Sequence, residues 1–239
     1  MGIDFSEVLS MDRKWIVVYG LTAAMILSII LGGKRAAQTF SEERGAQWCI
    51  VLDAGHGGED GGATSCTGVL ESGINLEITL RLRDLLHLLG RETRMIRTSD
   101  ISVYTKGGSI AQKKMSDLKE RVRIVNTTPN AMLLSIHQNN FSDSRYSGAQ
   151  VFYADTQGSE RLAKALQCAL ISSLNKGSNR KCKQSDGVYL MEHISCPGIL
   201  VECGFLSNPA EEARLRSPDY QRKLCCVIAT TVSSFLSGT

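Results

Sequence analysis

Four residues, His56, Glu71, His137 and Glu202, have the side-chain types of a catalytic metal site. Each alone has a simpler explanation, because a histidine after a strand commonly makes a turn hydrogen bond and a helix dipole favours a glutamate at a helix start. Together, two imidazoles and one carboxylate can hold zinc with an open position for water, while a second carboxylate serves as the base. We therefore predict that His56, Glu71 and His137 bind Zn²⁺ and that Glu202 is catalytic.

Three carboxylates lie close to His56 in the sequence and could act on it indirectly. Asp53, Glu59 and Asp60 could each orient the His56 ring, as carboxylates commonly do for metal-binding histidines. Acidic residues in loops are more commonly exposed to solvent and have no such role. Both interpretations therefore stay open.

Other polar residues are weaker candidates. Asn139 and Asn140 follow His137 and could donate to substrate or to an oxyanion, or simply form a turn. The two remaining histidines, His87 and His193, are expected to be structural or exposed. His193 would be the better replacement if one ligand were misassigned.

Several other site types do not fit the sequence. The stretch GHGGED, residues 55–60, has Asp where a dinucleotide fingerprint needs its third glycine, and no Gly-Lys-Ser/Thr follows for a phosphate loop. No Gly-x-Ser-x-Gly elbow supports a serine triad. The formal charge of +3, from 27 basic and 24 acidic residues, gives no basis for nucleic-acid binding.

The eight cysteines include no Cys-x-x-Cys pair, so a thiolate zinc site is not expected. Free, partly buried thiols are the simplest expectation. The even number still leaves disulfides open if the protein is exported.

Three short apolar runs, Cys49–Leu52, Ala131–Ile136 and Gly198–Val201, predict buried strands that lead into candidate residues. Apolar residues at helical spacing from Glu71 to Leu89, followed by Gly90, predict an amphipathic helix. Further strands are expected at Thr93–Ile96, Gly148–Tyr153 and Val188–Met191, and further helices from Ser116, over Ser159–Leu174, from Asn208 and from Ser217.

Strands that alternate with helices and are almost continuously apolar favour a largely parallel sheet buried on both faces. We therefore predict an α/β fold: a largely parallel, twisted mixed sheet of about six strands with helices on both faces, preceded by an N-terminal hydrophobic helix. Ligands bind beyond the carboxyl ends of the strands in such sheets. His56, His137 and Glu202 are predicted to lie at these ends.

Trp15–Leu31 is a run of 17 residues without a charge, with basic residues at both ends. Its length is at the lower edge for a membrane-spanning helix, and no clean small-x-small cleavage site follows. We expect residues 1–37 to be an uncleaved signal anchor, with a cleaved signal peptide as the second choice, and residues 38–48 to be a linker. A buried core helix is disfavoured because the run is apolar all round.

From about Cys49 to the C-terminus, the sequence resembles the zinc-dependent N-acetylmuramoyl-L-alanine amidases of the third amidase type. The resemblance is carried by LDAGHGGEDGGA at 52–63, Glu71 followed by Asn75, SDLKERVRIVN, SIHQNN at 135–140, SGAQVFY, and LVECGFLSNPAEE from Leu200. These motifs occur in the family's order and are jointly specific. Within the family, the sequence is most similar to the germination-specific, spore-cortex amidase.

The resemblance implies that residues 49–239 form an amidase catalytic domain acting on peptidoglycan. Such enzymes cleave the amide between muramic acid and L-alanine, in the cortex branch on the way to muramic δ-lactam. The family's zinc ligands fall on His56, Glu71 and His137, and its catalytic glutamate on Glu202. The substrate implies export across the cytoplasmic membrane, and the family suggests an accessory lipoprotein as a partner.

Two alternatives remain at this point. A zinc carboxypeptidase acting on the stem peptide would need a cation for the terminal carboxylate, for which Arg97 or Arg145 could serve. An inactive, membrane-anchored wall-binding relative would be expected to lack a ligand or the final glutamate. All four residues are present, which disfavours this second alternative.

Overall fold

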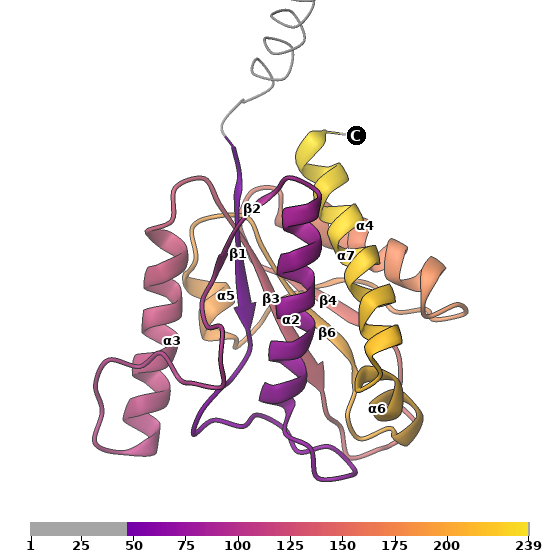
Figure 1. Ribbon diagram of the computed structural model, residues 1–239, viewed down its shortest axis with the longest axis horizontal. Helices are drawn as coiled ribbons and strands as arrows, with labels where there is room; N and C mark the ends of the chain where they lie inside the picture. Colours follow the sequence, from indigo (N-terminus) through magenta and orange to yellow (C-terminus); the bar gives the residue numbers. More distant parts are fainter. Residues whose placement is uncertain (1–46, 239) are drawn as a thin grey trace, which may run out of the picture. The chain divides into compact units, whose positions relative to one another are not determined.

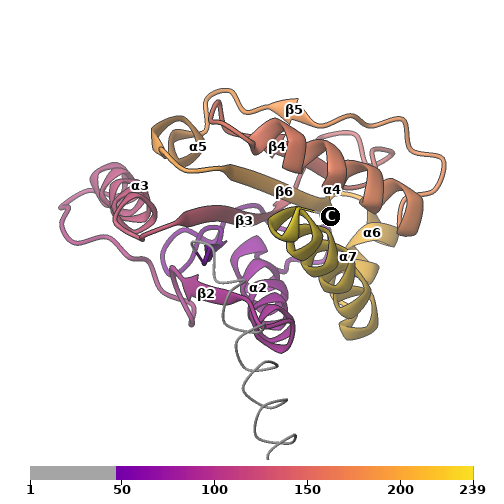
Figure 2. The same ribbon diagram turned by 90° about the horizontal axis from the view of Figure 1, so that it is seen from above.

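A computed structural model of the protein describes residues 47–238, and a six-stranded sheet with the order β2-β1-β3-β6-β4-β5 runs through it (Figure 1; β5 is labelled in Figure 2). The strands are β1 (Cys49–Ala54), β2 (Glu92–Met95), β3 (Ala131–Asn139), β4 (Gln150–Tyr153), β5 (Lys183–Gln184) and β6 (Gly198–Phe205). Strand β4 is antiparallel to β6, whereas all other neighbouring pairs are parallel. The predicted mixed, largely parallel sheet is confirmed.

Helices cover both faces of this sheet, as predicted (Figure 2). They are α2 (Glu71–Leu88), α3 (Ile110–Asn126), α4 (Ser159–Ser173), α5 (Tyr189–His193), α6 (Pro209–Leu215) and α7 (Pro218–Ser237). Helices α2, α4 and α7 pack on one face, and α3 and α5 on the other. Within residues 47–238, no helix combines the length and hydropathy that a membrane crossing requires. The predicted hydrophobic segment, residues 1–37, and the linker up to residue 46 lie outside the described residues.

The central strands are apolar on both sides because each side faces a layer of helices. Ile50 and Leu52 of β1 pack into the core shared with α2, α4 and α7, while Val51 packs into the smaller core beside α3 and α5. All three side chains are fully buried. Alternating side-chain direction along a strand therefore places apolar residues in both cores, which accounts for the continuous apolar run.

Strands β3 and β6 extend further than predicted. His137 and Glu202 were expected to follow their strands, but both lie within them, opposite each other in the parallel β3–β6 pair. The apolar runs end at Ile136 and Val201, but the strands continue beyond them. Backbone pairing does not depend on the side chains, so polar residues can extend a strand. A register shift between His137 and Asn139 marks the irregular end of this pairing.

The predicted strand at Val188–Met191 is wrong, because this segment forms helix α5 with Val188 as its N-cap. Leu190 and Met191 are both buried in the core beside α3, whereas neighbouring residues of a strand would point to opposite faces. The sixth strand is instead β5, in a segment for which the sequence predicts no strand. Phe152 of β4 pairs with Lys183 of β5.

Helix α3 begins at Ile110, six residues before the predicted start at Ser116. The Ser109 side chain accepts the N–H of Gln112, and the Gln112 side chain accepts the N–H of Ser109. This reciprocal capping box satisfies N–H groups that a helix start leaves unpaired. The loop between β2 and α3 is shorter than predicted for this reason.

A buried residue and an exposed residue of α2 allow a direct test of the core. Leu82 is fully buried, whereas Leu88 is 82% exposed. We expect Leu82→Ala to lower the free energy of unfolding by about 2–5 kcal/mol, because it removes buried methyl groups and leaves a cavity. Leu88→Ala should change it by less than about 0.5 kcal/mol. Urea unfolding followed by circular dichroism measures both; equal effects would contradict the assigned packing.

Candidate active site

The structure brings His56, Glu71 and His137 together from three separate elements. His56 follows β1, Glu71 is the first residue of α2, and His137 lies in β3. Glu71 Oε2 is 3.3 Å from His56 Nε2, and Glu71 Oε1 is 3.1 Å from His137 Nδ1. The two imidazole rings meet edge to face with centroids 5.0 Å apart.

The Glu71 carboxylate is held by backbone and side-chain donors as well as by the two rings. Ala63 N–H donates to Oε2 at 3.0 Å, and Gln138 N–H and Asn75 Nδ2 each donate to Oε1 at 3.0 Å. Burial raises the pKa of Glu71, but hydrogen bonds and charge interactions with His137 and His56 outweigh it and hold the pKa well below its usual range. This carboxylate is therefore ionised at neutral pH.

Asp60 is the carboxylate that orients His56. Its Oδ2 lies 3.0 Å from His56 Nδ1, which leaves Nε2 directed at Glu71. Burial lowers the pKa of His56, but its contacts with Glu71 and Asp60 outweigh burial and raise the pKa above its ordinary value. Carboxylates that accept from one ring nitrogen of a histidine commonly prepare the other nitrogen for metal binding.

The other two carboxylates near His56 have different partners. Asp53 is buried, forms an ion pair with Arg121 and accepts from Ser135 Oγ at 2.6 Å. Glu59 accepts from Lys113 Nζ at 2.8 Å. Neither orients the His56 ring, so of the three candidates only Asp60 contacts it.

Glycines leave the space in which these side chains meet. A Cβ atom at Gly55 would lie 2.2 Å from His137 Cε1, and one at Gly62 would lie 2.7 Å from both Glu71 Oε2 and His56 Cδ2. Gly62 also has a φ of +69°, a left-handed conformation that disfavours other residues. Any larger residue at Gly55 or Gly62 would therefore displace the three candidate ligands.

The three clustered residues fit a metal ion of the zinc type. Each offers one ligand atom, and these atoms lie within 4.8 Å of one another, the only such group found among residues 47–238. Two imidazole nitrogens and one carboxylate oxygen form a donor set typical of hydrolytic zinc sites, which keep one position open. The cluster could therefore hold a metal.

Glu202 lies beside this cluster, opposite His137 in the β3–β6 pair. Its Oε2 atom is buried and has no hydrogen-bond partner among the described residues. Burial and the negative charge of Glu71 raise the pKa of Glu202 to about 7, against the opposing effects of His137 and His56. A carboxyl group with this pKa can both accept and donate a proton at neutral pH.

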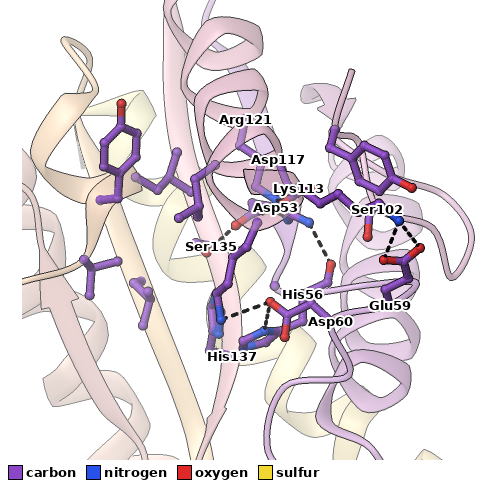
Figure 3. Close-up of a pocket in the computed structure, with 18 of the residues that line it drawn as sticks. Asp53, His56, Glu59, Asp60, Ser102, Lys113, Asp117, Arg121, Ser135 and His137 are labelled. Atoms are coloured by element: carbon purple, nitrogen blue, oxygen red, sulfur yellow. Dashed lines mark hydrogen bonds and ion pairs between the residues drawn. The ribbon is translucent and has the colours of Figure 1, made fainter. Parts of the chain in front are cut away.

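A cavity of about 340 Å³ opens beside the cluster, between α3, α5 and the sheet. His56 and His137 form part of its wall, together with Tyr104, Lys114 and Tyr189. Figure 3 shows His56, Asp60 and His137 grouped in this cavity, with Asp53, Ser135 and Arg121 beside them. The cluster is therefore accessible to a ligand.

The remaining polar candidates lie in other surroundings. His87 Nε2 is 2.6 Å from Thr93 Oγ1, and His193 stacks on Tyr189, so both are exposed surface histidines as predicted. Asn140 donates weakly to the Thr64 carbonyl at 3.4 Å, a loop contact. The eight cysteines are free thiols in this structure, and Cys49, Cys203 and Cys225 are buried.

Two buried polar residues, Gln138 and Asn75, support the cluster although neither is predicted to do so from the sequence. Gln138 Nε2 donates to Asn75 Oδ1 at 3.1 Å, and Asn75 in turn donates to Glu71 and to the Gly55 carbonyl. The four-residue spacing of Glu71 and Asn75 on one helix was a usable signal. Gln138 carried no such signal, because its role depends on the packing of β3 against α2.

Comparisons with known proteins identify the family of this chain. The family model described as N-acetylmuramoyl-L-alanine amidase matches residues 50–234. The chain is 39% identical over 181 residues to the germination-specific N-acetylmuramoyl-L-alanine amidase of Bacillus subtilis, an alignment that covers 75% of this chain and 76% of the relative.

Solved structures show the same fold. The CwlD amidase of Clostridioides difficile, solved in complex with the GerS lipoprotein, matches with a TM-score of 0.77 and 38% identity, covering 81% of this chain and 100% of that one. An N-acetylmuramoyl-L-alanine amidase of Clostridium difficile 630 matches with a TM-score of 0.70 and 27% identity, covering 82% and 100%. The chain belongs to the N-acetylmuramoyl-L-alanine amidase family and is an enzyme of peptidoglycan hydrolysis.

Proposed function

We propose that this protein is a zinc-dependent amidase that cleaves the bond between N-acetylmuramic acid and L-alanine during formation of muramic δ-lactam in the spore cortex. The observation that carries this proposal is the meeting of two imidazoles and an ionised carboxylate beside Glu202, whose Oε2 atom is buried and has no hydrogen-bond partner among residues 47–238. The similarity to a germination-specific amidase supports the cortex as the site of action.

In this proposal His56, Glu71 and His137 hold the zinc ion, and Asp60 fixes the orientation of His56. Zinc bound there would supply Lewis acidity toward the substrate carbonyl and lower the pKa of a water molecule. Glu202 takes a proton from the attacking water and passes it to the departing amine of L-alanine. Its pKa of about 7 suits both transfers.

The proposal also covers the N-terminal segment and an accessory lipoprotein partner. Residues 1–37 would direct export and, if uncleaved, anchor the protein on the outer side of the cytoplasmic membrane, where peptidoglycan lies. The CwlD relative was solved with the GerS lipoprotein. By analogy, we expect an accessory lipoprotein to bind this chain.

The carboxypeptidase alternative loses support from the structure. Arg97 is 2% exposed, and its guanidinium donates to four backbone carbonyls, so it is not available to a substrate carboxylate. The Arg145 side chain is 89% exposed and pairs with Asp143. Neither arginine lines the cavity beside the cluster, so neither is placed to recognise a terminal carboxylate there.

Replacement of the proposed base gives the first test of function. We expect Glu202→Gln to lower the rate of stem-peptide release by about 10²–10⁴-fold, because the amide cannot accept the proton. Zinc content and melting temperature should stay at wild-type values. Mass spectrometry of muropeptides measures the rate. Glu92→Gln, on an exposed position of β2, is the control; turnover of the Glu202 variant within threefold of wild type would refute the proposed role.

Ligand replacement tests the metal directly. We expect His56→Ala and His137→Ala to lose bound zinc and activity, whereas His193→Ala should keep one zinc per chain. Elemental analysis of the purified proteins measures zinc without depending on activity. Stoichiometric zinc in either of the first two variants would show that the ion is held elsewhere.

The reaction products separate the amidase from the alternatives. Wild-type protein with zinc should release intact stem peptides that begin with L-alanine, and a chelator should stop this release because the ligands then hold no metal. Addition of Zn²⁺ should restore it. Release of single amino acids from the peptide terminus would instead indicate a carboxypeptidase.

A further inference from the structure

Arg97, which follows β2, lies buried beneath the turn that carries His56. Its Nε donates to the Ala54 carbonyl at 2.8 Å, and its Nη2 donates to the carbonyls of Gly55 and Ser72, both at 2.9 Å. Its Nη1 donates to the Ser99 carbonyl at 3.0 Å. One planar guanidinium thus links Gly55, the residue before His56, to Ser72, the residue after Glu71.

Arg121 of α3 approaches the same turn and is also buried. Its Nη1 donates to the Ala54 carbonyl at 3.1 Å, and its Nη2 donates to the His56 carbonyl at 2.7 Å. Together the two arginines bind the three consecutive carbonyls of residues 54–56. These carbonyls end β1 and need partners once the strand leaves the sheet.

The turn that these arginines hold is strained. His56 has a φ of +62°, in the left-handed region that residues with a Cβ rarely adopt. Such a conformation persists only where the surroundings enforce it, and it is often found at functional sites. Gly57 follows with a φ of +129°, and a Cβ there would lie 2.9 Å from Arg97 Nε, so the guanidinium packs directly against the turn.

The charges of the two arginines are balanced differently. Arg121 forms ion pairs with Asp53 and Asp117. All four hydrogen bonds of Arg97 end on carbonyls, and among residues 47–238 no carboxylate pairs with it. The charges of Asp53, Asp100 and Asp117 favour the cationic form of Arg97 without forming an ion pair with it. Burying a cation that has no direct ion pair is costly, so the four carbonyl hydrogen bonds are what hold this guanidinium in place.

We propose that Arg97, assisted by Arg121, is a positioning residue that holds His56 in its left-handed conformation and fixes the spacing of His56 and Glu71 for metal binding. This inference rests on the proposed zinc site. Lysine cannot take over the role, because a single ammonium group lacks the planar fork that reaches several carbonyls.

The test compares Arg97→Lys with Arg94→Lys, a matched change on β2, where Arg94 makes one hydrogen bond to Thr128 at 2.9 Å. Zinc affinity is measured by competition with a chromophoric chelator. We expect Arg97→Lys to weaken zinc binding about 10–100-fold, the usual loss when support behind metal ligands is removed. Arg94→Lys should bind zinc as wild type does.

Hydrogen exchange of the metal-free proteins tests the same idea without zinc. In Arg97→Lys, we expect the amide hydrogens of residues 53–62 to exchange faster than in wild type. The increase should be at least about ten times the increase in the rest of the chain, because the amide hydrogen bonds of this segment depend on the fixed turn. Unchanged exchange in this segment, or an equal rise throughout the chain, would overturn the positioning role. Unchanged zinc affinity in the variant would also overturn it. Absence of zinc binding by wild type would instead refute the proposed function, while the exchange result would still decide the role of Arg97.

Discussion

The ionised carboxylate of Glu71 links the loop after β1, strand β3 and helix α2. It accepts N–H groups from the loop after β1, from β3 and from its own helix, and its two oxygens face the imidazoles of His56 and His137. Burying such a charge is costly unless it is fully paired. The two histidines and the three donors provide that pairing, so the positions of β1, β3 and α2 are coupled through one side chain.

Two glutamates in one site have opposite protonation properties because their surroundings differ. Glu71 is surrounded by donors, and its pKa is lowered. Glu202 has one buried oxygen that finds no hydrogen-bond partner within residues 47–238. Burial and the negative charge of Glu71 raise its pKa to about 7. Environment can divide two carboxyl groups into one that stays charged and one that exchanges protons. This division suits the roles proposed for them, Glu71 as a metal ligand and Glu202 as a general base.

Support for the site comes from backbone contacts more than from contacts between charged side chains. Arg97 and Arg121 bind the carbonyls at the end of β1, and glycines at positions 55, 57 and 62 let rings and guanidinium approach the chain closely. The glycine-rich turn is therefore closely packed in the folded protein. Its carbonyl groups are bound by arginines from distant parts of the sequence.

The sequence by itself determined the features that depend on residue type and on near neighbours. Continuous apolar runs predicted the central strands, helical spacing predicted α2, and the residue types of His56, Glu71, His137 and Glu202 predicted which side chains would meet. Tertiary structure alone decided that residues 188–191 form a helix, that Asp60 rather than Asp53 or Glu59 contacts His56, and that Arg97 is buried beneath the turn. Burial and the choice of partner depend on which distant segments pack together, and no local pattern in the chain records that packing.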